Sequence, residues 1–198
     1  MPKPFQRIMH YISQQGIVRP RDIEAIGLPR EYLLRLHRQG KVARSGRGLY
    51  SLPEAAVTEL HSYAEVARRV PGSVFCLLSA LAFHEITTQS PASVWIALQR
   101  GARSPAIGTP SLKVVRLSGR SLTEGIENHK VEGVPIRVYS VAKTVADCFK
   151  FRNKIGLDIA IEALKDALQE KKATVNEIYR YAKVCRVSNV IRPYMEAL

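Results

Sequence analysis

The apolar positions of the N-terminal region are spaced as in short helices. A helix is predicted over residues 4–15, where Ile8 and Ile12 mark one apolar face and a glycine follows the last turn. Two further helices are expected at residues 20–26 and 29–39, because each begins with proline and is followed by a glycine that stops it. The pattern therefore predicts three short helices joined by turns.

Two short strands are expected after the third helix. Residues 41–44 and 49–52 flank a glycine-rich turn at residues 45–48, a pattern that is typical of a β-hairpin. Three helices followed by a hairpin describe a winged helix-turn-helix. In this arrangement the third helix enters the major groove of DNA, and the hairpin, or wing, contacts phosphates or the minor groove.

The third predicted helix has a basic face. Leu33 and Leu36 are expected to pack inward, which leaves charged positions on the opposite side. A solvated surface would also explain such a stripe, but here it coincides with the turn, the wing and an excess of cations. Glu31 is repelled by phosphates unless it accepts a hydrogen bond from a cytosine amino group, so its role is open. The candidate DNA-binding residues are Arg19, Arg21, Arg30, Glu31, Arg35, Arg38, Lys41, Arg44 and Arg47.

The rest of the chain mixes helical and strand patterns. Residues 54–70 and 74–85 are predicted as helices, the second of them apolar nearly all round. The expected fold class is α+β, with a winged helix-turn-helix domain at residues 1–53 and a mixed α/β domain with a helical C-terminal end at residues 54–198. Strands are expected at 94–98 and 112–117, a hairpin at 126–131 and 134–140, and helices at 141–151, 157–169, 175–184 and 190–197.

The charge of the chain is strongly positive and unevenly distributed. With 46% hydrophobic and 24% charged residues, the composition is that of a globular protein and excludes disorder as the main state. The 198 residues carry 30 Lys and Arg against 17 Asp and Glu, a net charge of +13. Residues 1–53 hold ten of these cations and three of the acids, a net of +7. A cationic module on a larger body points to a polyanionic partner.

Neither a membrane segment nor a secretory signal is expected. The longest apolar run, residues 74–83, is interrupted by Ser79 and falls well short of the roughly 20 residues that a spanning helix needs. The N-terminus lacks the apolar stretch of a signal peptide. Cys76, Cys148 and Cys185 are far apart and form no C-x-x-C pair, so neither a disulfide framework nor a zinc site is predicted. The expected location is the reducing cytoplasm.

No catalytic, cofactor or metal site is predicted, and the chain is not expected to be an enzyme. Lys143 and Thr144 invite comparison with a phosphate-binding loop, but the glycines that would wrap the phosphate are missing. The acid-x-Lys pattern at residues 170–172 lacks the partner carboxylate that metal-assisted hydrolysis requires. Ser79, Lys143 and Asp147 remain candidates in the C-terminal domain. Lys143 and Asp147 are four positions apart on one helix, which fits a structural salt bridge better than a ligand site.

Four segments of the two predicted domains carry recognisable motifs: residues 33–42 (LLRLHRQGKV), 47–53 (RGLYSLP), 78–86 (LSALAFHEI) and 141–147 (VAKTVAD). Together they resemble the AbiEi family of antitoxins, the regulatory partners in bacterial abortive-infection toxin–antitoxin pairs. The wing, with its Arg-Gly-x-Tyr turn, is the most specific element of the resemblance. Glu85 stands where the family has glycine, so the turn after that helix is expected to differ.

The resemblance implies a two-part protein of the type IV toxin–antitoxin class that takes part in phage defence. Its N-terminal domain would bind inverted repeats in its own promoter and repress the operon. Its C-terminal domain would counteract a nucleotidyltransferase-like toxin, by direct binding or without stable contact. Two alternatives stay open: a stand-alone winged-helix regulator whose C-terminal domain positions two winged modules on DNA, and a nucleic-acid-processing enzyme.

Overall fold

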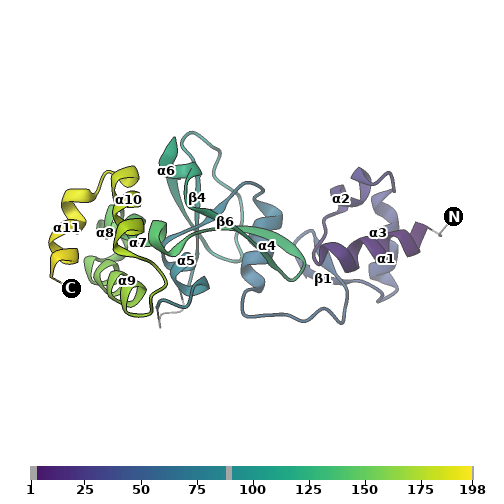
Figure 1. Cartoon of the computed structure of the whole chain (residues 1–198). Helices are drawn as coiled ribbons and strands as arrows, with labels where there is room; N and C mark the ends of the chain where they lie inside the picture. Colours follow the sequence, from purple (N-terminus) through teal and green to yellow (C-terminus); the bar gives the residue numbers. More distant parts are fainter. Residues whose placement is uncertain (1–3, 88–90, 198) are drawn as a thin grey trace. The chain divides into compact units, whose positions relative to one another are not determined.

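The chain forms two compact units. The computed structural model describes residues 4–87 and 91–197 (Figure 1). Unit 1 comprises residues 1–71 together with 129–136, and unit 2 comprises residues 72–128 together with 137–198. The domain boundary expected at residue 53 remains a prediction, because the two units are defined by their internal contacts and not by independent folding. Unit 1 reaches further along the chain than that division and is discontinuous in sequence.

Unit 1 contains the predicted three helices and wing. The buried faces of the helices, with Ile8, Ile23 and Leu33 fully enclosed, form one hydrophobic core, and Tyr50 of the wing packs into the same core. The two wing strands pair antiparallel, with Arg44 opposite Tyr50. The elements are α1 (Pro4–Gln15), α2 (Pro20–Ala25), α3 (Arg30–Arg38), β1 (Ala43–Gly46), β2 (Leu49–Ser51) and α4 (His61–Arg69).

The helix expected over residues 54–70 forms only in its second half, as α4. Residues 54–59 are exposed and non-helical. A short segment that buries no apolar side chain gains too little from packing to offset the cost of starting a helix. The backbone N–H of Thr58 is instead bound by the Glu132 carboxylate, which comes from the hairpin tip that belongs to unit 1.

Unit 2 combines a mixed sheet with helices. Its helices and strands are β3 (Val74–Phe75), α5 (Leu77–Phe83), β4 (Val94–Gln99), β5 (Leu112–Leu117), α6 (Arg120–Thr123), the base of the hairpin formed by β6 (Ile126–Val131) and β7 (Val134–Tyr139), α7 (Val141–Lys150), α8 (Arg152–Ile155), α9 (Leu157–Gln169), α10 (Val175–Cys185) and α11 (Ser188–Glu196). The strand order is β5-β4-β3-β7-β6. Strand β4 runs parallel to β5, β3 runs antiparallel to β4, and β3 and β7 are parallel.

Helix α7 lies at the centre of unit 2. Nine of its ten residues are buried, and it packs against α5, α9 and α10. Its first turn is capped by the Ser140 side chain, which accepts a hydrogen bond from the N–H of Lys143. The mixture of helix and strand confirms the expected α+β class.

The prediction of a single helix over residues 74–85 is wrong for its first turn. Val74 and Phe75 form strand β3, and α5 begins only at Leu77, whose φ is +47°. The whole run is apolar and buried, so its periodicity does not separate a short buried strand from a buried helix. The other predicted strands and the four C-terminal helices are confirmed, with ends that differ by one or two residues. The four-residue helices α6 and α8 were not expected.

Candidate nucleic-acid interface

Helix α3 presents a basic face because its apolar residues are fixed on the other side. Leu33 and Leu36 are at most 1% exposed, whereas Arg35 and Arg38 are exposed. Neither arginine side chain has a hydrogen bond or ion pair within the part of the chain that the structure describes. Two solvated guanidinium groups are therefore available on one face of a helix that follows the helix-turn-helix turn, which is where base contacts are made in this fold.

The start of α3 is electrostatically balanced. Arg30 Nε lies 3.5 Å from Glu31 Oε1 and 3.9 Å from Glu24 Oε1. All three side chains are more than half exposed, so these pairs contribute little to stability. The positive potential of the helix is consequently stronger toward Arg35 and Arg38 than toward its first turn.

The wing carries the second group of cations. Arg47 lies exposed in the turn between β1 and β2, beside Gly48, whose φ of +72° suits glycine. The Arg44 side chain is exposed, and its Nε donates to the carbonyl of Gly46 at 3.3 Å. Lys41, between α3 and β1, is exposed as well. The contacts of these three cations to DNA phosphates stay a prediction.

The two arginines predicted at the start of α2 have different surroundings. Arg21 is exposed, but the Arg19 side chain is only 17% exposed. Arg19 Nη2 lies 2.8 Å from Asp22 Oδ1, and Nη1 donates to the carbonyl of Arg68. Burial raises the pKa of Asp22, but the hydrogen bonds from Arg19 outweigh it and hold this pKa below its usual value. The structure thus gives Arg19 internal partners, and its DNA contact stays a prediction.

Arg68 of α4 is a positioning residue that sequence reasoning missed. Its Nη2 donates to both the backbone carbonyl and the side-chain oxygen of Gln15, each at 3.0 Å, while its own carbonyl accepts from Arg19. Burial lowers the pKa of Arg68. The residue therefore joins the end of α1 to the beginning of α2. No local pattern predicts a contact between residues that are 53 positions apart.

Glu132 is a second positioning residue. It lies in the hairpin tip at residues 129–136, and its carboxylate accepts hydrogen bonds from Thr58 N–H at 2.7 Å and from Thr58 Oγ1 at 2.9 Å. The ring Nδ1 of His61 is 2.7 Å from its other oxygen. Burial raises the pKa of Glu132, but the hydrogen bonds from Thr58 and His61 outweigh it and lower this pKa below 4.5.

The carboxylate of Glu132 is expected to make the stability of unit 1 sensitive to acid. Because its pKa is lower in the folded than in the unfolded chain, its contribution is fully present above about pH 4.5 and is lost as the pH falls through the folded pKa. Glu132→Gln is expected to cost about 1–3 kcal/mol at pH 7 and much less in acid. Urea unfolding from pH 7 to pH 3 measures this difference. Glu59 is an exposed carboxylate next to Thr58, so Glu59→Gln should change the free energy of unfolding at neither pH.

The three candidates of the C-terminal domain are enclosed in unit 2. Ser79, Lys143 and Asp147 are each at most 1% exposed. Ser79 Oγ accepts from the N–H of Trp95 at 2.8 Å, and Lys143 Nζ lies 2.5 Å from Asp147 Oδ2. Side chains that are buried to this degree have almost no contact with solvent, so the observed contacts favour a structural role. Their assignment to a ligand site stays a prediction.

The buried pair on α7 belongs to a larger internal network. Cys185 Sγ donates to Asp147 Oδ1 at 3.1 Å, and Lys143 Nζ lies 4.1 Å from the centroid of the Tyr139 ring. Burial and the charge of Asp147 raise the pKa of Cys185 to about 12, so this thiol stays protonated at neutral pH. Both oxygens of Asp147 consequently have a donor.

Neither a metal cluster nor a membrane span is found in the described ranges. Within residues 4–87 and 91–197, no three His, Cys, Asp or Glu side chains gather in a way that could hold a metal ion. Over the same residues no helix combines the length and apolarity needed to cross a membrane.

Comparison with known proteins supports both the fold and the nature of the N-terminal module. The chain is similar to a crystal structure of the RV2827C protein from Mycobacterium tuberculosis, with 15% sequence identity and a TM-score of 0.58 over 92% of this chain and 72% of that chain. Residues 6–53 match a family of transcriptional regulators described as AbiEi antitoxins. No curated protein matches the chain. The resemblance expected from the N-terminal motifs is thereby confirmed over residues 6–53.

Proposed function

From the match of residues 6–53 to a family of transcriptional regulators described as AbiEi antitoxins, we propose that the protein is an antitoxin that represses its own operon by binding inverted repeats in the promoter. The single observation that supports DNA binding best is the exposed, unpaired state of Arg35 and Arg38 on α3. A DNA-bound regulator acts in the cytoplasm of a bacterium.

The proposed interface divides into base contacts and phosphate contacts. Helix α3 would enter the major groove, where Arg35 and Arg38 are suited to guanine, the base that arginine recognises with two hydrogen bonds. The wing would hold the phosphate backbone through Arg44 and Arg47. The other members of the interface are Arg19, Arg21, Arg30, Glu31 and Lys41.

Substitution at the two sites is expected to separate these roles. Arg35→Ala should weaken binding to the DNA upstream of its own gene by about 1–3 kcal/mol and leave binding to scrambled DNA nearly unchanged, because it removes a base contact. Arg47→Ala should weaken binding to both DNAs by similar factors and reduce the dependence on salt, because it removes a phosphate contact. Gel shifts of the full chain over a salt series measure both effects. Equal losses on both DNAs for both variants would contradict this division.

Antagonism of a nucleotidyltransferase-like toxin is the second half of the proposal, and its support is the description of the family that residues 6–53 match as antitoxins. Co-expression with the neighbouring toxin gene should restore the growth of cells that the toxin alone arrests. Gel filtration of the mixed proteins then distinguishes direct from indirect action, because only direct binding gives co-elution. A chain that represses its promoter but does not restore growth would instead be a stand-alone regulator.

A further inference from the structure

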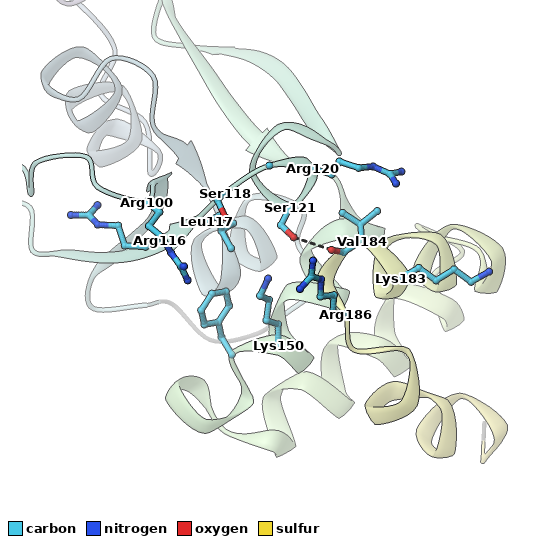
Figure 2. Close-up of a pocket in the computed structure, with 12 residues that line it drawn as sticks. Arg100, Arg116, Leu117, Ser118, Arg120, Ser121, Lys150, Lys183, Val184 and Arg186 are labelled. Atoms are coloured by element: carbon cyan, nitrogen blue, oxygen red, sulfur yellow. Dashed lines mark hydrogen bonds between the residues drawn. The ribbon is translucent and has the colours of Figure 1, made fainter.

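Unit 2 contains a basic hollow that the proposed function does not use. It has a volume of about 650 Å³ (Figure 2). Arg100, Arg116, Arg120, Lys150, Lys183 and Arg186 are among the residues that line it, and the described lining includes no carboxylate. Volumes of this size are typical of small-molecule sites.

Two of the arginines lie at the same edge of the sheet. Strands β4 and β5 are parallel and in register, with Leu98 opposite Arg116, and the N–H of Arg100 donates to the carbonyl of Leu117 at 2.8 Å. Arg100 and Arg116 therefore lie together at the carboxyl ends of neighbouring parallel strands. In sheets with parallel strands this edge is the usual place for ligands.

The other cations come from the helical part of unit 2. Lys150 is the last residue of α7, and Arg186 directly follows α10. The Ser121 hydroxyl donates to the carbonyl of Val184 at 2.9 Å, which fixes the end of α10 beside α6 (Figure 2). Cations from four different parts of the sequence are in this way brought to one hollow.

The cations that line the hollow differ in the direction of their side chains. Figure 2 shows Lys150 and Arg186 pointing toward the middle of the hollow, whereas Arg120 and Lys183 point away from it. Arg120 is paired with Glu124, and Lys183 Nζ lies 5.8 Å from the centroid of the Tyr179 ring. The two outward cations are thus engaged elsewhere.

The remaining four cations lack a compensating charge. Within the described residues, Arg100, Lys150 and Arg186 have no ion pair. Arg116 donates from Nη2 to Ser104 Oγ at 2.9 Å, but its Nη1 is buried and has no hydrogen-bond partner among those residues. Like charges at close range destabilise a fold, and a buried guanidinium nitrogen without an acceptor adds a further penalty. An anion in the hollow would reduce the repulsion between the cations and would give the buried nitrogen of Arg116 an acceptor.

We propose that this hollow binds an oligophosphate, either free or as the phosphate chain of a nucleotide. An oligophosphate places several negative charges along one short chain, which matches several cations converging on one small volume. Guanidinium groups bind phosphate oxygens with two parallel hydrogen bonds, and the Ser118 hydroxyl in the lining supplies a neutral donor. Binding at this site would be independent of the DNA contacts of unit 1.

Arg186 allows a test in which binding and folding are separated. Its backbone lies in the left-handed region with φ of +60°, a conformation that glycine adopts without strain. Arg186→Gly is therefore expected to fold at least as stably as the wild type while it loses a ligand contact. Lys171→Gly is a matched control, because Lys171 is also an exposed cation with φ of +55° after a helix and does not line the hollow.

The experiment is isothermal titration of the full chain with ATP and with inorganic triphosphate at constant ionic strength. The wild type should bind at one saturable site, and Arg186→Gly should weaken binding about tenfold or more, the value of one charge-assisted phosphate contact. Lys150→Gln should weaken it as well, and Lys171→Gly should leave it unchanged. Thermal unfolding of each variant verifies that it is folded.

The two probes distinguish the source of the oligophosphate. Equal affinities identify the phosphate chain as the recognised group, and tighter binding of ATP identifies a nucleotide. Absence of saturable binding by either probe would overturn the proposal, as would equal weakening in Arg186→Gly and Lys171→Gly. A loss of duplex DNA affinity in Arg186→Gly without binding of either probe would also overturn it, and would assign the hollow to the nucleic-acid backbone.

Discussion

Asp147→Ala is expected to lower the free energy of unfolding by about 3–5 kcal/mol, because it leaves the ammonium group of Lys143 buried without a counter-charge. The substitution also removes the acceptor of the Cys185 thiol. Both partners of the pair are at most 1% exposed, so water does not replace the lost carboxylate. Urea unfolding followed by circular dichroism measures the loss.

A double variant shows whether the charge or the packing is responsible. The double variant Lys143→Met, Asp147→Leu removes both charges and fills a similar side-chain volume with apolar atoms. Its free energy of unfolding should be close to that of the wild type or higher. If the double variant were as unstable as Asp147→Ala, the loss would come from disturbed packing of α7. If Asp147→Ala were as stable as the wild type, the pair would not be part of a rigid core.

Gly16→Ala is the second substitution with a large expected effect, a loss of more than about 2 kcal/mol in the stability of unit 1. The backbone of Gly16 has a φ of +68°, a conformation that costs alanine about 1–2 kcal/mol. A Cβ atom there would lie 1.6 Å from the carbonyl oxygen of Glu132, so the hairpin tip would have to move away. Its hydrogen bonds to Thr58 and His61 would then be lost.

Gly40→Ala is the control for the steric part of this effect. Gly40 has almost the same φ, +70°, but a Cβ atom at this position meets nothing within 4 Å. Urea unfolding followed by the fluorescence of tyrosines compares the two variants, and Gly16→Ala should be clearly less stable. Equal losses would mean that backbone conformation alone sets the cost and that the tip does not restrain Gly16.

The local architecture of the N-terminal module follows from its sequence because short-range rules determine it. Prolines begin helices, glycines end them, and the spacing of Leu33 and Leu36 orients α3. The same rules fail at Val74 and Phe75, where burial removes the polar positions that distinguish strand from helix. They also fail at residues 54–59, where helix propensity without a buried face is insufficient.

The contacts that support the candidate interface, and the hollow in unit 2, join residues far apart in the sequence, which no short-range rule describes. Arg35 and Arg47 were predictable because exposure follows from local periodicity and turn position. The roles of Arg68 and Glu132 were not, because their partners are more than 50 positions away in the sequence. The basic hollow was not predictable for the same reason, since Arg100, Lys150 and Arg186 are far apart in the sequence and only the fold brings them together.

The discontinuity of unit 1 also determines when this unit is completed during protein synthesis. The ribosome releases the helices and wing early, but residues 129–136 follow only after more than half of the chain has been made. Until then Gly16 lacks its neighbour in the hairpin tip, and Thr58 and His61 lack the Glu132 carboxylate. A nascent chain, or one cut short before residue 129, would therefore hold an unfinished unit 1, and only a chain that extends past residue 136 contains all the contacts of this unit.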